Sequence, residues 1–505
     1  MKVKRNPTRP RLKVTADARS VVGHAGARLL SDLAEEVGLT EGLSVAMAPT
    51  KRRRRGHDRG QVLVDLAVMV AGDGEAISDL ATLRDQPELF GQVASTPTAW
   101  RTLEAVDDNA QGRIATARAA ARTAVWAAGA DPGFYVLDFD GTLVGSHSEK
   151  EGAAPTYKRG FGFHPLLCFL DATGEALAAI LRPGNAGSNT TADHVALLDL
   201  ALAQLPVDPA TVEVVARADS AALTHGFVNA CRTAQVRFSI GHDLTEPIRN
   251  ACLATPTRRW LPAITADGSS EREGAEVAEI TDLLDLSLWP AGTRAIARRE
   301  EPHPGAQLTF TDANGLRYQV FITDLPDADV AYLEALQRGR GRAEKLICDL
   351  KATGLSNLPS ADFAINEAWV TVALMAHDLL AWTRLVALDG GSGPGRAQAA
   401  ALLPPPHRRG DRAQRAPCPA PTRRRVALVR GTRRRLRARP RPTPDHLTSP
   451  PRPRAAALVH AARQPQSLHA ADETRPRCGA YHRRAPQRVI ERQGATGGRL
   501  EKGPG

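Results

Sequence analysis

Hydrophobic residues in the first 130 positions recur at the spacing of an α-helix. Leu29, Leu30 and Leu33 fall on one side of such a helix, and charged residues occupy the other side. The same spacing occurs in three segments, over residues 25–37, 61–70 and 76–83. The sequence therefore predicts a helical N-terminal region over residues 1–130.

The pattern changes at residue 134, where strand signals begin. An apolar run over 134–144 indicates a buried strand. Two apolar stretches, 163–171 and 176–182, flank a turn sequence and predict an antiparallel hairpin. Two helices and two strands then alternate, over 192–205, 212–219, 224–234 and 236–240. The predicted order β-β-β-α-β-α-β indicates a mixed α/β fold, because it is neither a Rossmann alternation nor an all-β pattern.

Residues 251–326 look rich in β-hairpins. Gln307–Thr311 and Leu316–Thr323 flank the pair Asn314-Gly315, which is a strong signal for a tight hairpin turn. Helices are expected over 327–351 and 361–386. Trp369, Val372, Met375, Leu379 and Trp382 form an apolar stripe along the second of them, and we interpret this stripe as core.

The charge of the chain is unevenly distributed. The formal net charge of the 505 residues is +11, but the segment from Gly390 onward holds 26 Lys and Arg against 6 Asp and Glu. Residues 1–389 therefore carry a net charge of −9, so the charge of this part of the chain does not indicate a general affinity for nucleic acid. The segment 390–505 is rich in Arg, Pro and Ala and lacks apolar periodicity, which predicts disorder. A shifted reading frame in its gene would explain the same composition.

The expected environment is a reducing cytoplasm. Six cysteines are scattered without a Cys-x-x-Cys pair, which argues against a zinc site and a disulfide framework. The sequence shows no signal peptide after Met1 and no uninterrupted apolar run of about 18 residues.

One compact cationic cluster precedes a predicted helix in the N-terminal region. It consists of Lys51, Arg52, Arg53, Arg54 and Arg55. Such a cluster is either a solvated loop or a set of contacts to DNA phosphates, which would position a duplex without reading its sequence.

Three carboxylates stand where phosphodiester chemistry would need them. Asp140 ends the first predicted strand, and Asp219 ends a later one. Glu344 lies on the helix expected over 327–351, with Arg340 four residues before it and Lys351 seven residues after it, on one helix face. That stripe is either a solvated row of charges or a site with an acid for metal and two cations for phosphates. Converging carboxylates are what two divalent ions about 3.5–4 Å apart require.

These motifs resemble a DDE (Asp-Asp-Glu) transposase of a bacterial insertion sequence, whose catalytic core is RNase H-like. The resemblance is carried by Leu137–Thr142, Ser148–Pro155, Lys158–Pro165, Arg217–Ser220 and the spacing Arg-x3-Glu-x6-Lys from Arg340 to Lys351. Many relatives have a tyrosine three residues before that arginine, where this chain has Gln337. The resemblance covers roughly residues 20–389.

The resemblance implies an enzyme that binds the inverted repeats of an element and joins the freed 3′-hydroxyls to target DNA. It implies Asp140, Asp219 and Glu344 as catalytic metal ligands for Mg²⁺, with Mn²⁺ as a substitute, and contacts to DNA from Arg340 and Lys351. A homodimer would hold the two ends. The implied divisions are a DNA-binding region (1–130), a catalytic core in two parts (131–250 and 327–389), a β-rich insertion (251–326) and the tail (390–505).

The first carboxylate has two candidates, because Asp138 and Asp140 fall on the same face of an ideal strand. Asp138 is therefore a possible additional metal ligand. In an alternative interpretation, Asp138-Phe-Asp-Gly-Thr142 opens a HAD-like phosphatase with Asp138 as nucleophile, but no later Gly-Asp motif at a strand end supports it. A second alternative is an inactive DNA-binding remnant of a transposase.

Overall fold

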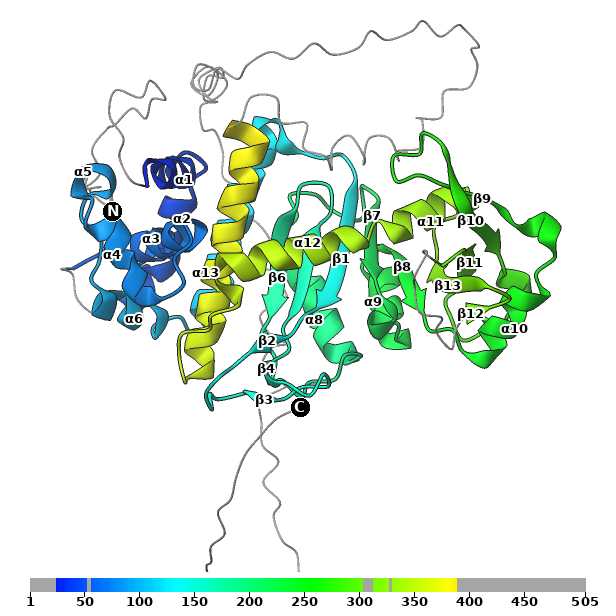
Figure 1. The fold of residues 1–505 in the computed structure, drawn as a ribbon. Helices are drawn as coiled ribbons and strands as arrows, with labels where there is room; N and C mark the ends of the chain where they lie inside the picture. Colours follow the sequence, from blue (N-terminus) through cyan, green and yellow to red (C-terminus); the bar gives the residue numbers. More distant parts are fainter. Residues whose placement is uncertain (1–23, 52–55, 303–311, 327–328, 388–505) are drawn as a thin grey trace, which may run out of the picture. The chain divides into compact units, whose positions relative to one another are not determined.

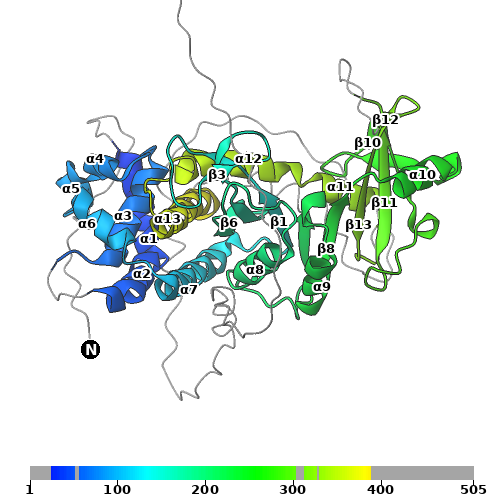
Figure 2. The same cartoon turned by 90° about the horizontal axis from the view of Figure 1, so that it is seen from below.

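A computed structural model describes residues 24–51, 56–302, 312–326 and 329–387. Within these ranges, most strands join one large mixed sheet, and the helices pack on its faces and beside it (Figures 1 and 2). The mixed α/β class predicted from the sequence is confirmed. The predicted tail (390–505) and the arginines 52–55 lie outside the described residues.

The large sheet has the strand order β6-β5-β1-β7-β8-β13-β11-β10-β9, with β12 paired to β13. Strands β1, β7 and β8 are parallel to one another, and the other pairs are antiparallel. The bounds are β1 Tyr135–Gly141, β5 Leu166–Leu170, β6 Glu175–Ile180, β7 Val214–Ala218, β8 Arg237–His242, β9 Leu261–Ile264, β10 Glu271–Glu279, β11 Arg294–Glu300, β12 Asp312–Ala313 and β13 Leu316–Thr323.

The strands and helices predicted between residues 134 and 242 are all present in the predicted order. The hairpin is β5 and β6, and the helices are α8 (Thr191–Leu202) and α9 (His225–Thr233). The Asn-Gly signal is also confirmed. Asn314 and Gly315 have φ of 54° and 78°, the left-handed pair that a type I′ turn between β12 and β13 requires.

The β-rich region after residue 250 extends the same sheet instead of forming a sheet of its own. Strand β13 pairs antiparallel with β8, with Ile322 opposite Ile240. This pairing covers an edge of β8 that would otherwise expose unpaired backbone groups. Sequence patterns predict strands but do not identify their partners, so this continuity was not foreseen.

A small second sheet is inserted between β1 and β5. It has the order β2-β4-β3, with β2 Val144–Gly145, β3 Ala154–Pro155 and β4 Phe161–Phe163. It follows directly after β1, so it lies beyond the carboxyl end of that strand (Figure 1).

The N-terminal region is helical, as predicted. Its α-helices are α1 Ala25–Glu36, α2 Leu39–Met47, α3 Arg59–Ala71, α4 Ala81–Arg84, α5 Pro87–Phe90, α6 Thr96–Leu103 and α7 Asp108–Val125. Asp58 and Asp107 cap α3 and α7 by accepting hydrogen bonds from backbone N–H groups at the first turn. Short turns lie at Ala48–Thr50, Ile77–Leu80 and Trp126–Ala130.

The remaining helices are α10 Glu246–Ala254, α11 Val330–Arg338, α12 Gly341–Leu350 and α13 Phe363–Trp382, with short turns at Ser220–Ala222, Thr257–Arg259, Thr281–Leu283, Lys351–Leu355 and Thr383–Ala387. Helices α11 and α12 run in succession across one face of the large sheet (Figure 1). The single helix expected over 327–351 is therefore two helices, and the break between them lies at Gly339 and Arg340.

Helix α13 joins the N-terminal helices to the sheet. It packs against α3 and α1 and against β6, and its stripe from Trp369 to Trp382 is buried, as predicted. Among the described residues, 363–387 form one helical segment long and apolar enough to span a membrane, but much of that segment is buried in the core.

A buried ion network fixes this junction. Arg122 of α7 pairs with Glu175 of β6 at 2.9 Å and with Asp378 of α13 at 2.8 Å, and Arg118 also pairs with Asp378 at 2.8 Å. The indole N–H groups of Trp126 and Trp382 both donate to Glu175. Every group of the network is almost completely buried, so each charge depends on its partners for compensation.

Replacing Asp378 with Ala should lower the free energy of unfolding by about 3–5 kcal/mol, because it leaves Arg118 and part of Arg122 buried without a counter-charge. Urea unfolding followed by circular dichroism measures this change. The matched control is Asp282→Ala, which breaks the solvent-exposed pair with Arg259 and should change the free energy of unfolding far less. Equal effects of the two changes would contradict the role assigned to the network.

Candidate active site

The carboxyl ends of β1 and β7 bring Asp140 and Asp219 together. The two strands are parallel neighbours, and their register pairs Phe139 with Ala218. Asp140 and Asp219 are the next residues of each strand, so their backbones are about one strand spacing apart, roughly 4.8 Å. The Asp219 side chain also accepts a hydrogen bond from the backbone N–H of Ala221 at 3.0 Å, which fixes its orientation at the start of a short helical turn.

The two carboxylates influence each other electrostatically. Burial raises the pKa of Asp140; Arg340 opposes the shift, and the negative charge of Asp219 adds to it. Arg340 donates to the Asp140 carboxylate at 2.9 Å. Two acids and one guanidinium leave an excess of negative charge and several hard oxygen atoms at this edge of the sheet, which favours a cation there.

Asp138 lies on the same strand face as Asp140 but is completely buried in an ion pair. Arg217 of β7 donates to both of its carboxylate oxygens, at 2.6 and 2.8 Å. The expectation that Asp138 shares metal binding is therefore not supported, because both oxygens already accept hydrogen bonds from the guanidinium. For the same reason Asp138 is not placed as the nucleophile of a phosphatase.

Arg217 also positions the helices that cross the sheet. It pairs with Asp171 at 3.2 Å and donates to the carbonyl oxygen of Leu336, near the end of α11, at 2.6 Å. Although burial alone would lower it, the pKa of Arg217 lies above its ordinary value, because Asp138 and Asp171 stabilise the cation. Asp171 in turn accepts from Arg342 of α12 at 2.6 Å.

The corner between α11 and α12 needs a residue without a side chain. A Cβ atom at Gly339 would lie 2.6 Å from a terminal nitrogen of Arg217 and 2.8 Å from one of Arg342. Gly339 therefore allows both guanidinium groups to pass beneath the corner. This contact determines where α12, and with it Arg340 and Glu344, lies relative to β1 and β7.

Gln337 is a further link between this corner and the strands. Its side-chain amide donates to the carbonyl oxygen of Ala218 at 3.0 Å and its oxygen accepts from Ser239 at 2.7 Å. Gln337, at the position where many relatives are expected to carry a tyrosine, thus links α11 to β7 and β8.

Glu344 lies on α12, one turn beyond Arg340, and is exposed. No group of three or more His, Cys, Asp or Glu side chains in the described part of the chain is close enough to hold a metal ion. The structure thus gathers Asp140, Asp219 and Arg340 but does not bring Glu344 into contact with them. Lys351 follows α12 and is partly exposed; burial, and then the nearby charge of Lys158, lower its pKa.

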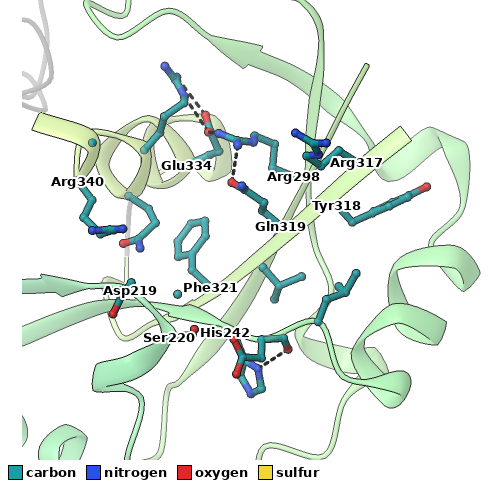
Figure 3. A pocket seen from close by; sticks show the side chains of 17 residues that line it. Asp219, Ser220, His242, Arg298, Arg317, Tyr318, Gln319, Phe321, Glu334 and Arg340 are labelled. Atoms are coloured by element: carbon teal, nitrogen blue, oxygen red, sulfur yellow. Dashed lines mark hydrogen bonds and ion pairs between the residues drawn. The ribbon is translucent and has the colours of Figure 1, made fainter. Parts of the chain in front are cut away.

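A cleft of about 670 Å³ opens from Asp219 and Arg340 along β11 and β13 (Figure 3). Arg298, Arg317, Tyr318 and Gln319 line its far part. Arg298 and Arg338 both pair with the buried carboxylate of Glu334, each at 2.8 Å. These residues were not predicted from local patterns. The density of arginines on the strands of the β-rich region is the sequence signal that could have identified them.

The cationic cluster 52–55 lies outside the described residues, but its flanks are placed. Lys51 donates to the carbonyl oxygen of Gly56 at 3.2 Å, and Arg59 of α3 donates to that of Thr50 at 2.6 Å. The role of Arg52, Arg53, Arg54 and Arg55 in DNA binding stays a prediction.

Comparison with known proteins gives a family match. The family model described as "Transposase DDE domain group 1" matches residues 4–397. Among solved structures, the cryo-EM structure of a piggyBac transposase synaptic complex with hairpin DNA is similar at 10% identity and a TM-score of 0.36, over 77% of this chain and 80% of that one. At that score the structural similarity supports no functional conclusion. No curated protein matches the sequence.

Replacing Asp140 with Asn should raise the unfolding midpoint at neutral pH in metal-free buffer. Because the pKa of Asp140 is raised, its ionised form is less stable in the fold than its neutral form. This penalty is absent below the ordinary carboxylate pKa and complete above the pKa in the folded protein. The gain from Asn should therefore shrink as the pH falls through that window.

Urea titrations of both proteins across the pH range measure the effect. The control is Asp85→Asn, at an exposed position. If the unfolding midpoint of Asp140→Asn at neutral pH is equal to or below that of the wild type, the ionised Asp140 carboxylate does not destabilise the folded protein.

Proposed function

Because the chain belongs to the DDE transposase domain family, we propose that it is the transposase of a bacterial insertion sequence. In this proposal it binds the ends of the element, cleaves phosphodiester bonds there and joins the 3′-hydroxyls to target DNA. The observation that carries the proposal is the pair of carboxylates, Asp140 and Asp219, at the adjacent ends of two parallel strands.

The donor atoms at this edge of the sheet suit a divalent cation. Asp140 and Asp219 offer hard carboxylate oxygens. Burial, and to a smaller extent the charge of Asp219, raise the pKa of Asp140, and a bound cation would offset both effects. We propose Glu344 as the third ligand, since it is exposed on α12 one turn beyond Arg340. Bound Mg²⁺, or Mn²⁺ in its place, would polarise the scissile phosphate and lower the pKa of the attacking hydroxyl.

Arg340 and Lys351, the two cations that flank α12, would contact DNA phosphates in this mechanism. Arg340 lies beside Asp140, and in this proposal its guanidinium would contact a non-bridging oxygen of the phosphate that meets the carboxylates. Lys351 lies at the other end of the same helix and would contact a phosphate further along the strand. The network of Arg217 keeps these groups at fixed positions relative to the strand ends.

Two further parts of the proposal follow from the task. Joining two ends requires that both be held at once, so we propose a homodimer in the synaptic complex. We also propose a cytoplasmic protein that acts on the bacterial chromosome.

Removing either proposed ligand should abolish cleavage without unfolding the protein. We expect Asp219→Ala and Glu344→Ala to slow cutting of end-containing DNA by about a hundredfold or more in Mg²⁺. Each change removes a proposed ligand of the metal ion, which would stabilise the charge of the transition state by several kcal/mol. Asp349→Ala is the matched control, because Asp349 is also an acid of α12 but pairs with Lys345 on the surface.

The outcomes separate the possible functions. Unchanged cutting by Glu344→Ala would show that Glu344 is not a metal ligand, and the family assignment would still hold. Wild-type protein that binds the ends but never cuts them would be an inactive remnant. Hydrolysis of a small phosphate ester that depends on Asp138 would instead favour the phosphatase.

A further inference from the structure

Arg340 is held at the candidate metal site by a single contact. One terminal nitrogen of its guanidinium donates to Asp140 at 2.9 Å, and the arginine side chain is 22% exposed. Among the described residues, this guanidinium bonds to no other group. Arg217, by contrast, is fully buried and holds three partners at once. The contact of Arg340 can therefore open while the network of Arg217 stays intact.

The backbone of Arg340 is fixed independently of this contact. Gln337 links the corner between α11 and α12 to β7 and β8, and Arg217 holds the end of α11. Release of Asp140 thus requires only a rotation of the arginine side chain. The cleft of about 670 Å³ gives space for that rotation, because Arg340 lines one end of it together with Asp219 (Figure 3).

The pair with Arg340 occupies a carboxylate that a divalent cation would need. The guanidinium bonds to one oxygen of Asp140, whose side chain is 12% exposed. A guanidinium does not lose its proton in a protein, so the pair opens only by an exchange of charged partners. Divalent ions such as Mg²⁺ bind carboxylate oxygens directly. The arginine and such an ion therefore compete for Asp140.

The lining of the cleft favours an anion that would draw Arg340 away. It includes Arg298, Arg317 and Arg338 in addition to Arg340. A nucleic-acid strand that entered the cleft would bring phosphate oxygens, which bind a guanidinium through two N–H groups at once. Such a phosphate would offer Arg340 a partner in place of Asp140.

We propose that Arg340 couples DNA binding to metal binding by exchanging Asp140 for a phosphate of the DNA. While the pair is closed, Arg340 opposes the binding of a divalent cation to Asp140. When Arg340 moves to a phosphate, Asp140 and Asp219 lose the positive charge beside them, and their affinity for the cation rises. The cation is then held tightly only where DNA is bound. The inference rests on the proposed function.

The test measures the affinity for Mn²⁺ and requires no cleavage. The full-length protein is titrated with Mn²⁺, and the free ion is followed by electron paramagnetic resonance. Without DNA, Arg340→Gln should bind Mn²⁺ about 5- to 150-fold more tightly than the wild type, the usual range for coupled sites. A duplex of the element's end should then increase the Mn²⁺ affinity of the wild type by a larger factor than that of the variant. Mn²⁺ bound by the duplex alone is subtracted.

Three controls separate this exchange from a general effect of charge or folding. Lys345→Gln removes a positive charge from an exposed position of α12, where it pairs with Asp349, and should change the Mn²⁺ affinity far less. Asp140→Asn should weaken Mn²⁺ binding, and adding Arg340→Gln to it should give no further gain. Arg340→Gln should retain the circular dichroism spectrum of the wild type, because only one partly exposed bond is lost.

The outcomes distinguish this exchange from the proposed function. If a folded Arg340→Gln binds Mn²⁺ no more tightly than the wild type without DNA, the pair does not compete with the cation and the inference is wrong. An equal gain from Lys345→Gln would also overturn it, because charge alone would then explain the result. The proposed function would stand in both cases as long as the wild type cuts the ends. A wild type that neither binds Mn²⁺ nor cuts DNA would contradict the proposed function, and this exchange with it.

Discussion

The guanidinium of Arg217 is the point on which the geometry of the candidate site depends. It holds Asp138 of β1, Asp171 after β5 and the carbonyl oxygen of Leu336 at once, and it is fully buried. A buried cation of this kind is tolerated only if each partner stays in place. The strand that carries Asp140, the strand that carries Asp219 and the corner leading into α12 are therefore fixed relative to one another by one side chain.

The sequence predicted the elements well because their signals are local. Apolar runs, the hairpin turn at Asn314-Gly315 and the helical stripe from Trp369 to Trp382 each depend on residues near one another in the chain. The adjacency of Asp140 and Asp219 also followed from local signals combined with the family resemblance, since both acids end predicted strands. The ion pair of Asp138 was not predicted, because strand alternation gives the face of a residue but not the partner that meets it there.

The features that could not be predicted from the sequence depend on packing between distant segments of the chain. Nothing near Asp138 in the sequence identifies Arg217, 79 positions away, as its partner. The pairing of β13 with β8 and the arginine-lined cleft likewise arise only when distant segments meet. The position of Glu344 shows the same limit. Helical spacing placed it on one face with Arg340, yet the distance of that face from the strand ends depends on the corner at Gly339.

The packing of α13 has a consequence for how the protein matures. Helices α1 and α3 share their core with α13, the last long helix in the described part of the chain. During synthesis their apolar faces therefore stay incompletely covered until about 300 further residues have been made. A nascent chain in that condition is a natural client of chaperones.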